Sequence, residues 1–179
     1  MNRYIEKKHV IHTFSPDHVP AASARPGETL IFETYDCHMG QLLREGSDFD
    51  HMDKSLANPA TGPVYIEGAC PQDILRLAIR NIELDQVGIL DKGPTAGALK
   101  EHFPEYIIRR LPVKDGMVHY GHLQIPVRPM IGVIGTAPKG HAVSTLAPGD
   151  HGGNMDCTSI GPGAVLYLPV RVPGALLAM

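Results

Sequence analysis

The sequence predicts a mainly β protein of the sandwich or barrel type with a few short helices. Glycine and proline are unusually frequent, at 19 and 16 of 179 residues, and both disfavour the interior of a helix. The hydrophobic content of 43% is that of a globular chain rather than a disordered one. Short segments rich in β-branched and aromatic residues recur between turn-forming residues, which is typical of such folds.

Five segments have the composition of β-strands and are bounded by glycine, proline or polar turn residues. In chain order they are residues 29–36, 62–68, 117–127, 130–135 and 164–170. The first follows the turn-forming pair Pro26-Gly27. Pro126 breaks the third segment, and Pro129 separates the third from the fourth. Two short helices are expected near residues 37–43 and 95–103. Since no long linker divides the chain, residues 1–179 are expected to form a single domain.

Residues 73–84 fit two kinds of element. Their apolar residues can be placed on one stripe of a helix, which the spacing slightly favours. Leu75, Leu77 and Ile79 equally fit the alternation of a strand, with a bulge correcting the phase before Ile82. Periodicity alone leaves both interpretations open.

Charge and cysteine content argue against several classes of function. Sixteen Lys and Arg stand against 19 Asp and Glu, so there is no positive surplus to bind the phosphates of a nucleic acid. No segment approaches the ~18 apolar residues of a membrane span, and the first residues lack the apolar core of a secretory signal. Three widely spaced cysteines indicate reduced thiols in a cytoplasmic protein.

The segment at residues 170–179 is apolar to its last residue. Chain ends are usually polar and loosely ordered. An apolar end therefore indicates a buried strand, contact with a partner chain, or a polypeptide that continues beyond Met179.

Residues 148–157 contain the densest group of chemically active side chains. Asp150, His151, Asn154 and Asp156 lie within seven residues, around a Gly-Gly pair that allows a sharp turn. Histidine and carboxylates are ligands of Zn²⁺ and related metals. The alternative, which composition alone favours, is a turn stabilised by side-chain bonds of Asp150 and Asn154 to their own backbone.

Two further polar groups follow strand-like segments. Cys37 and His38 could form a nucleophile–base pair. Alternatively, Asp36 caps a turn and Cys37 is buried as a small hydrophobic residue. Glu67 is a candidate general base or metal ligand, or an exposed charge at the end of a strand. For both groups the residues alone favour the structural alternative.

Four blocks of the sequence closely resemble the acetamidase/formamidase family, in the family's order. They are Phe-Glu-Thr-Tyr-Asp-Cys (32–37), Asn-Pro-Ala-Thr-Gly-Pro-Val-Tyr-Ile-Glu-Gly-Ala (58–69), Pro-Gly-Asp-His-Gly-Gly-Asn-Met-Asp (148–156) and Gly-Ala-Val-Leu-Tyr-Leu-Pro-Val-Arg-Val-Pro-Gly-Ala-Leu (163–176). The resemblance implies a mainly β, oligomeric, metal-dependent protein. It implies hydrolysis of formamide, acetamide or related short amides to ammonia and a carboxylate. It also implies that residues 73–84 include a strand.

The resemblance further implies roles for the polar residues. Asp36, His151 and Asp156 would contribute to a centre for a divalent metal, most readily Zn²⁺ or Ca²⁺, and this metal would activate water. Glu67 would act as base and acid, and Asn154 would orient substrate or ligands. An alternative enzymatic route uses Cys37 as the nucleophile of an acyl transfer.

Members of the family continue past the last block into further segments that carry acidic and histidine site residues. The resemblance therefore implies that this chain is the N-terminal part of a longer fold. The expected partners are a small amide and either further copies of the chain or a second chain supplying the missing part, with no nucleic acid or membrane. A different hypothesis is an inactive or incomplete member that serves as a structural subunit.

Overall fold

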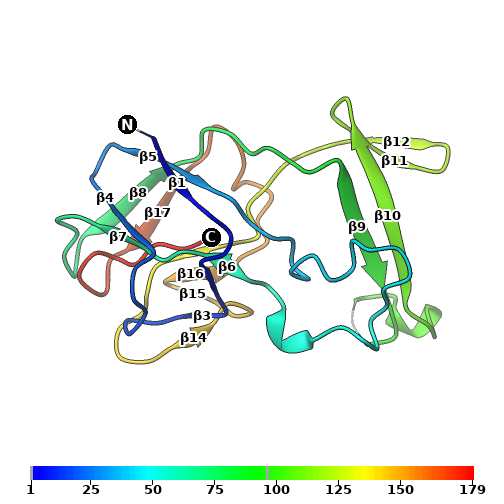
Figure 1. Cartoon of the computed structure of the whole chain (residues 1–179), viewed down its shortest axis with the longest axis horizontal. Helices are drawn as coiled ribbons and strands as arrows, with labels where there is room; N and C mark the ends of the chain where they lie inside the picture. The colour runs from blue at the N-terminus through cyan, green and yellow to red at the C-terminus, as the bar shows by residue number, and fades with distance from the viewer. Residues whose placement is uncertain (1, 96) are drawn as a thin grey trace. The chain divides into compact units, whose positions relative to one another are not determined.

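In the computed structural model, residues 2–95 and 97–179 are described, and they form β-strands joined by turns and two single-turn 3-10 helices. The mainly β prediction is confirmed. The backbone forms two compact units, which are described separately. Unit 1 comprises the chain up to Met39 together with Ser55–Ile82 and Met130–Met179, and unit 2 comprises Gly40–Lys54 and Glu83–Pro129. Figure 1 traces both units along the chain by colour.

Unit 1 is built from many short strands. They are β1 (Asn2–Ile5), β2 (Val10–Ile11), β3 (Thr13–Phe14), β4 (Ala22–Ala24), β5 (Thr29–Phe32), β6 (Ala60–Thr61), β7 (Val64–Ile66), β8 (Ile74–Ala78), β13 (Val133–Gly135), β14 (Val143–Ser144), β15 (Pro148–Gly149), β16 (Gly152–Asn154) and β17 (Val165–Pro169). Most strands pair with a strand distant in sequence: β1 with β5, β2 with β6, β3 with β14, β4 with β7 and β8 with β17, while β13, β16 and β15 form one small sheet. The helix η1 (Lys54–Leu56) lies where the chain returns to this unit.

The apolar segment at the end of the chain lies in the core of unit 1. Residues 175–178 are buried. Leu177 exchanges backbone hydrogen bonds with Val64 at 2.9 and 2.7 Å, and Ala178 does so with Gly135 at 3.0 and 2.9 Å. The apolar segment therefore occupies a buried, strand-like position within unit 1.

Unit 2 is organised around one antiparallel sheet. Its strands are β9 (Val87–Lys92), β10 (Ile107–Lys114), β11 (Met117–Tyr120) and β12 (Leu123–Pro126), in the order β12-β11-β10-β9. The helix η2 (Lys100–His102) lies between β9 and β10. From β10, the guanidinium of Arg110 donates to the carbonyl oxygens of Leu43, Arg44 and Ser47 and so ties the loop at residues 43–47 into this unit.

The five predicted strand segments all contain strands, although shorter ones than expected. Residues 117–127 form a hairpin, because the turn between β11 and β12 interrupts the run. Residues 73–84 contain β8, paired with β17 in antiparallel register, which confirms the strand and makes the helical interpretation wrong. Leu75 and Leu77 pack against a core cluster while Ile74 and Arg76 are exposed, which is the alternation of a strand.

The helix expected near residues 37–43 is absent from the structure, which has turns there. The Met39 amide donates to the Asp36 carbonyl oxygen at 3.0 Å, and Met39 then adopts a φ of 55°. This left-handed conformation stops a right-handed helix from continuing. The helix expected near residues 95–103 is reduced to η2. Within the described part of the chain, no helix is both apolar and long enough to cross a bilayer.

Candidate functional site

The hairpin of β15 and β16 holds His151 in the interior of unit 1. Gly149 pairs with Gly152, so Asp150 and His151 occupy the two-residue turn between the strands. Asp150 is exposed, whereas His151 retains only 3% of its accessible surface. The Thr136 amide donates to the His151 carbonyl oxygen at 2.9 Å and fixes the backbone of the turn. Adjacent residues therefore face different environments, one solvent and one core.

Glycines around the turn leave room for the imidazole and for the neighbouring backbone. Gly152 and Gly153 have φ of 99° and 86°, in the left-handed region. A Cβ on Gly153 would lie 2.2 Å from the Ala147 carbonyl oxygen and 3.1 Å from His151 Nε2. A Cβ on Gly149 would lie 2.8 Å from His151 Nδ1. The sharp turn predicted from the Gly-Gly pair is confirmed, and the close approach of the backbone adds a second reason for glycine.

The environment of His151 favours a neutral imidazole. Phe14 packs edge-on against the ring, with 5.2 Å between centroids and 66° between planes. Burial lowers the pKa of His151, and the Asp150 carboxylate opposes this only in part. Nε2 is buried and has no hydrogen-bond partner among the described residues. A neutral imidazole with an unengaged nitrogen can accept a proton or bind a metal ion.

An open depression of about 420 Å³ lies beside the hairpin. Its lining combines apolar groups with charged and imidazole side chains: Pro138, Lys139, His141, Val143, Pro148, Gly149, Asp150, His151 and Arg171. Arg171 donates from Nη2 to Asp150 Oδ2 at 2.7 Å. The depression thus brings the buried imidazole together with exposed cationic groups.

Asn154 and Asp156 follow His151 but are held by different contacts. Asn154 pairs with Val133 in the sheet, and its Nδ2 donates to the Leu146 carbonyl oxygen at 3.3 Å. Asp156 is exposed, and its amide donates to the Gly132 carbonyl oxygen at 3.1 Å. An Asp156 carboxyl oxygen would lie only 2.8 Å from a Cβ on Gly132. The side chain of Asn154 is therefore bonded to the loop that precedes the hairpin. The side chain of Asp156 lies beside Gly132, the residue that precedes β13.

Asp36 caps a turn, as the structural alternative predicts. Its Oδ1 accepts a hydrogen bond from the His38 amide at 3.1 Å. Cys37, in contrast, is exposed, so the expectation that it is buried as a small hydrophobic residue is wrong. Cys37 lies in the turn that follows β5, outside any strand, and its side chain is exposed there.

Glu67 lies immediately after β7 and is exposed. Its carboxylate accepts hydrogen bonds from Arg25 Nε at 3.1 Å and Ser23 Oγ at 3.3 Å, both from the segment around β4. Within the described residues, these side-chain contacts do not include His151 or Asn154. Glu67 thus has the environment of an exposed, ion-paired charge at the end of a strand.

The predicted metal ligands do not assemble into a complete set. Among the described residues, no three His, Cys, Asp or Glu side chains are grouped closely enough to hold a metal ion. Asp36, His151 and Asp156 alone therefore do not fit a bound divalent ion. His151 is the member whose chemistry suits a ligand, because its buried Nε2 has no hydrogen-bond partner in the described part of the chain. The involvement of Zn²⁺ or Ca²⁺ stays a prediction.

Sequence reasoning missed Phe14, Lys139, His141 and Arg171. Phe14 belongs to a two-residue strand near the beginning of the chain, and it reaches His151 because β3 pairs with β14. Lys139 and His141 belong to none of the four sequence blocks, and Arg171 lies in the block at residues 163–176, where nothing marked it as a site residue. Only the folding of the chain brings them to one depression.

Comparison with known proteins gives one consistent result. The model of the acetamidase/formamidase family matches residues 2–144. An acetamidase of Bacillus halodurans has a similar crystal structure, with a TM-score of 0.95 and 41% identity, over 98% of this chain and 60% of that one. The crystal structure of a predicted acetamidase/formamidase of Thermoanaerobacter tengcongensis has a TM-score of 0.96 and 42% identity, and the match covers 99% of this chain and 60% of that one. A formamidase of Methylophilus methylotrophus is 25% identical over 223 residues, covering 92% of this chain and 55% of its own length. The chain spans less than two thirds of each of these relatives.

Proposed function

This chain belongs to the acetamidase/formamidase family, and on that premise we propose that it takes part in hydrolysing short linear amides to ammonia and a carboxylate. Formamide and acetamide are the proposed substrates. The observation that carries the proposal is the near-identical fold of an acetamidase, with a TM-score of 0.95. The buried imidazole of His151 beside an open depression supports the same conclusion.

Amide hydrolysis requires an activated nucleophile, stabilisation of the carbonyl oxygen and an acid for the leaving amine. A neutral imidazole can take a proton from an attacking water and return it to the amine. His151 has the neutral form and the unengaged Nε2 that this role needs. Phe14 and the glycine turn hold the ring, which limits the number of orientations it can adopt.

We propose that a divalent ion, Zn²⁺ or Ca²⁺, takes part, with His151, Asp156 and Asp36 as candidate ligands. Such an ion would lower the pKa of bound water and polarise the amide carbonyl. Since no three such side chains are grouped among the described residues, binding would require ligands in addition to these three.

Glu67 and Asn154 keep their proposed roles as acid–base group and orienting residue. For Glu67 this requires the carboxylate to leave Arg25 and Ser23, its partners in the structure. Asn154 would act by holding the loop at Leu146 that precedes the hairpin. Glu67→Gln should then reduce ammonia release, whereas Arg25→Gln should leave it or increase it.

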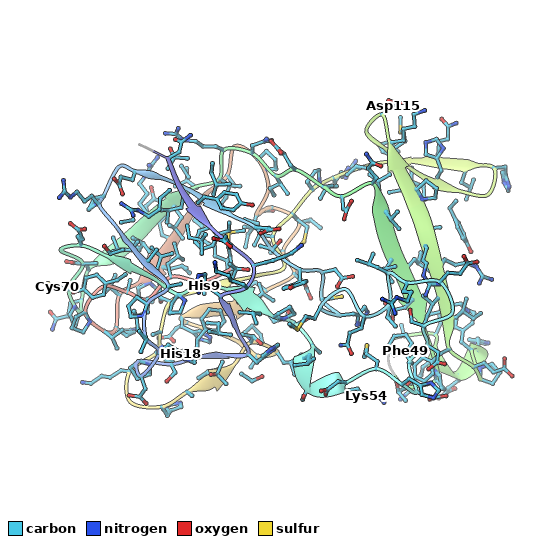
Figure 2. The ribbon with its side chains drawn as sticks, viewed as in Figure 1. His9, His18, Phe49, Lys54, Cys70 and Asp115 are labelled. Carbon is cyan, nitrogen blue, oxygen red and sulfur yellow. The ribbon has the colours of Figure 1, made fainter. Side chains whose placement is uncertain are left out.

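The direct test measures ammonia release from formamide and acetamide, and bound metal, with added Zn²⁺ or Ca²⁺ and after chelation. We expect His151→Ala and Asp156→Ala to abolish both hydrolysis and metal binding. His18→Ala is a matched control, because His18 Nε2 already contacts the Thr13 carbonyl oxygen at 2.8 Å. Figure 2 shows His18 on the loop beside β3. Full hydrolysis and metal content in both site variants would contradict the proposal.

A second candidate function is that of a structural subunit or of one part of a divided enzyme. The observation that favours it is that no three potential metal-ligating side chains are grouped among the described residues. The chain covers 60% of the acetamidase structure of Bacillus halodurans. The test mixes the chain with a polypeptide corresponding to the uncovered part of that acetamidase. Ammonia release by the mixture alone favours a divided site, and release by the chain alone contradicts it.

We propose a cytoplasmic, homo-oligomeric protein or one with a completing partner chain. Cys37, Cys70 and Cys157 are all exposed and none forms a disulfide, which suits a reducing compartment. Sedimentation of the purified chain, with intact mass of any co-purifying chain, distinguishes the two assemblies.

A further inference from the structure

We propose that β12, at one end of the sheet in unit 2, pairs with β12 of a second copy of this chain. The two strands would run antiparallel about a two-fold axis and join the two sheets edge to edge. The inference is independent of the proposed hydrolysis, and it gives the homo-oligomer proposed above a contact surface. Figure 1 labels β12 beside β11, its one partner strand among the described residues.

β12 is an open sheet edge that lacks charged side chains. The edge strands of this sheet are β9 and β12. β9 carries Asp91 and Lys92, and charges on an edge discourage pairing with another chain. β12 has the sequence Leu-Gln-Ile-Pro, and residues 121–127 contain no Asp, Glu, Lys or Arg. Pro126, at the last position of β12, lacks an N–H and so limits the length of any pairing.

The backbone groups of Gln124 lie on the open side of β12. In an antiparallel pair, successive residues direct their N–H and C=O groups alternately towards and away from the partner strand. The Val127 amide donates to the Gly116 carbonyl oxygen at 2.9 Å, on the β11 side. By alternation, Ile125 bonds to β11, whereas Gln124 and Pro126 face outward. Their outward groups therefore point to a side on which the described residues include no further strand.

One face of the β11–β12 hairpin is apolar and exposed. Leu123 lies opposite Tyr120. Ile125, two residues along β12, is on the same face and lies opposite Val118. Tyr120, Leu123 and Ile125 are 41%, 46% and 47% exposed. Since a two-stranded hairpin is marginally stable by itself in water, a further strand on the open edge would stabilise it and cover part of this face.

The open edge is complementary to itself. A two-fold axis through Gln124 places this residue opposite its own copy, where the two can exchange a pair of N–H to C=O bonds. The same axis places Leu123 of each copy opposite Ile125 of the other, in the closer, non-hydrogen-bonded pairs. An axis through Ile125 would instead pair Gln124 with Pro126, which has no N–H to donate. No like charges meet at this edge, which favours a second copy as the occupant.

The size of the contact predicts a weak, reversible dimer. Stable interfaces bury about 800 Å² per partner, and an edge strand of four residues offers less. We expect a dissociation constant between about 1 μM and 1 mM. Sedimentation of the full chain should therefore show a monomer–dimer equilibrium, without larger species, because two-fold pairing closes on itself. A monomer at concentrations up to about 1 mM would overturn the proposal.

Two substitutions of Gln124 test the backbone pairing. Gln124→Pro removes the outward N–H of each copy, so the dimer loses two hydrogen bonds and should weaken about 30-fold. Gln124→Ala keeps this N–H and should dimerise like the parent. Because the N–H does not bond to β11, urea denaturation at low protein concentration should give similar stabilities for both variants. Equal dimerisation of the two variants would overturn the proposal.

A pair of double variants tests the register without altering the backbone. In Leu123→Lys/Ile125→Lys, introduced lysines of the two copies lie opposite each other, and the dimer should be lost. In Leu123→Lys/Ile125→Glu, an introduced lysine lies opposite an introduced glutamate, so the dimer should persist and weaken with salt. Leu90→Lys, at a leucine of β9 that is 39% exposed, is the control and should leave association unchanged. Loss of the dimer in both double variants, or in Leu90→Lys, would overturn the pairing of β12 with its copy.

The outcomes separate this surface from the other proposals. A dimer that neither Gln124→Pro nor the double lysine variant weakens overturns the contact through β12 and leaves a homo-oligomer formed elsewhere. A co-purifying chain of different mass that Gln124→Pro releases also overturns it, because the occupant would then be another protein. Ammonia release is measured separately and tests the hydrolysis alone.

Discussion

Phe14 packs edge-on against the imidazole of His151, with ring centroids 5.2 Å apart. Phe14 is itself only 1% exposed and lies in β3, which pairs with β14. The first and last thirds of the chain thus meet at this contact. Its physical effect is to exclude water from one side of the imidazole, which favours the neutral ring.

The buried His151 should make the stability of the protein depend on pH. Burial lowers its pKa below the ordinary 6.5, so the unfolded chain takes up the proton at a higher pH than the folded chain. The free energy of unfolding should therefore be unaffected above about pH 6.5 and fall as the pH drops from there to the lowered pKa. Urea denaturation at several pH values, compared with His151→Gln, measures this contribution.

The pKa of His51 is shifted in the opposite direction to that of His151, so His51 serves as a control for the pH dependence of stability. Its hydrogen bond with Asp48 raises its pKa, so its contribution is present below pH 6.5 and is lost as the pH rises through the raised pKa. His51→Gln should therefore lower stability only on the acid side. An identical pH profile for the parent protein and His151→Gln would show that His151 is not held neutral by the fold.

Gly153→Ala should destabilise the protein more than Gly163→Ala. The two glycines have nearly equal φ, 86° and 89°, so the backbone strain of a side chain is similar, at about 1 kcal/mol. A Cβ on Gly153 would also lie 2.2 Å from the Ala147 carbonyl oxygen, whereas Gly163 has nothing within 4 Å. Chemical denaturation of the two variants measures the difference. Equal losses would mean that the hairpin can move away from Ala147 without cost.

Leu177→Ala should destabilise unit 1 by about 2–5 kcal/mol, the usual range for truncating a buried leucine. Leu177 is 2% exposed and belongs to the core cluster with Ile131, Ile134 and Ile160. Leu146→Ala is the matched control, because Leu146 is 54% exposed. Urea denaturation should show a lower free energy of unfolding for Leu177→Ala and little change in it for Leu146→Ala. Similar values would place the segment at residues 175–178 outside the cooperative core.

Cys37→Ala should leave amide hydrolysis unchanged if water is the nucleophile. Cys37 is exposed, so its removal leaves no cavity and should not affect folding. Ammonia release and acyl-adduct formation, followed by mass spectrometry, test this, with Cys157→Ala as a second exposed thiol. Loss of hydrolysis in Cys37→Ala alone would instead support the thiolate route.

The local pattern of the sequence locates six of the seventeen strands in the described residues. Proline and glycine interrupt the strand-like segments, and these segments contain β5, β7, β11, β12, β13 and β17. Residues 73–84 are different, because helical and strand patterns coincide there, and pairing of β8 with β17 decides between them. At residues 37–43 the left-handed Met39 ends any helix, a backbone feature that the predicted pattern does not reveal.

At the candidate site, residue type and spacing were enough to predict the motif with His151 and the need for glycine beside it, because turn geometry is local. The tertiary structure decided which side chains surround that imidazole. Phe14, Lys139 and Arg171 come from separate segments that only strand pairing and burial bring near His151. It also decided that Asp36, His151 and Asp156 do not by themselves form a metal site. A ligand set depends on distances through space, and residue type and spacing along the chain do not specify these.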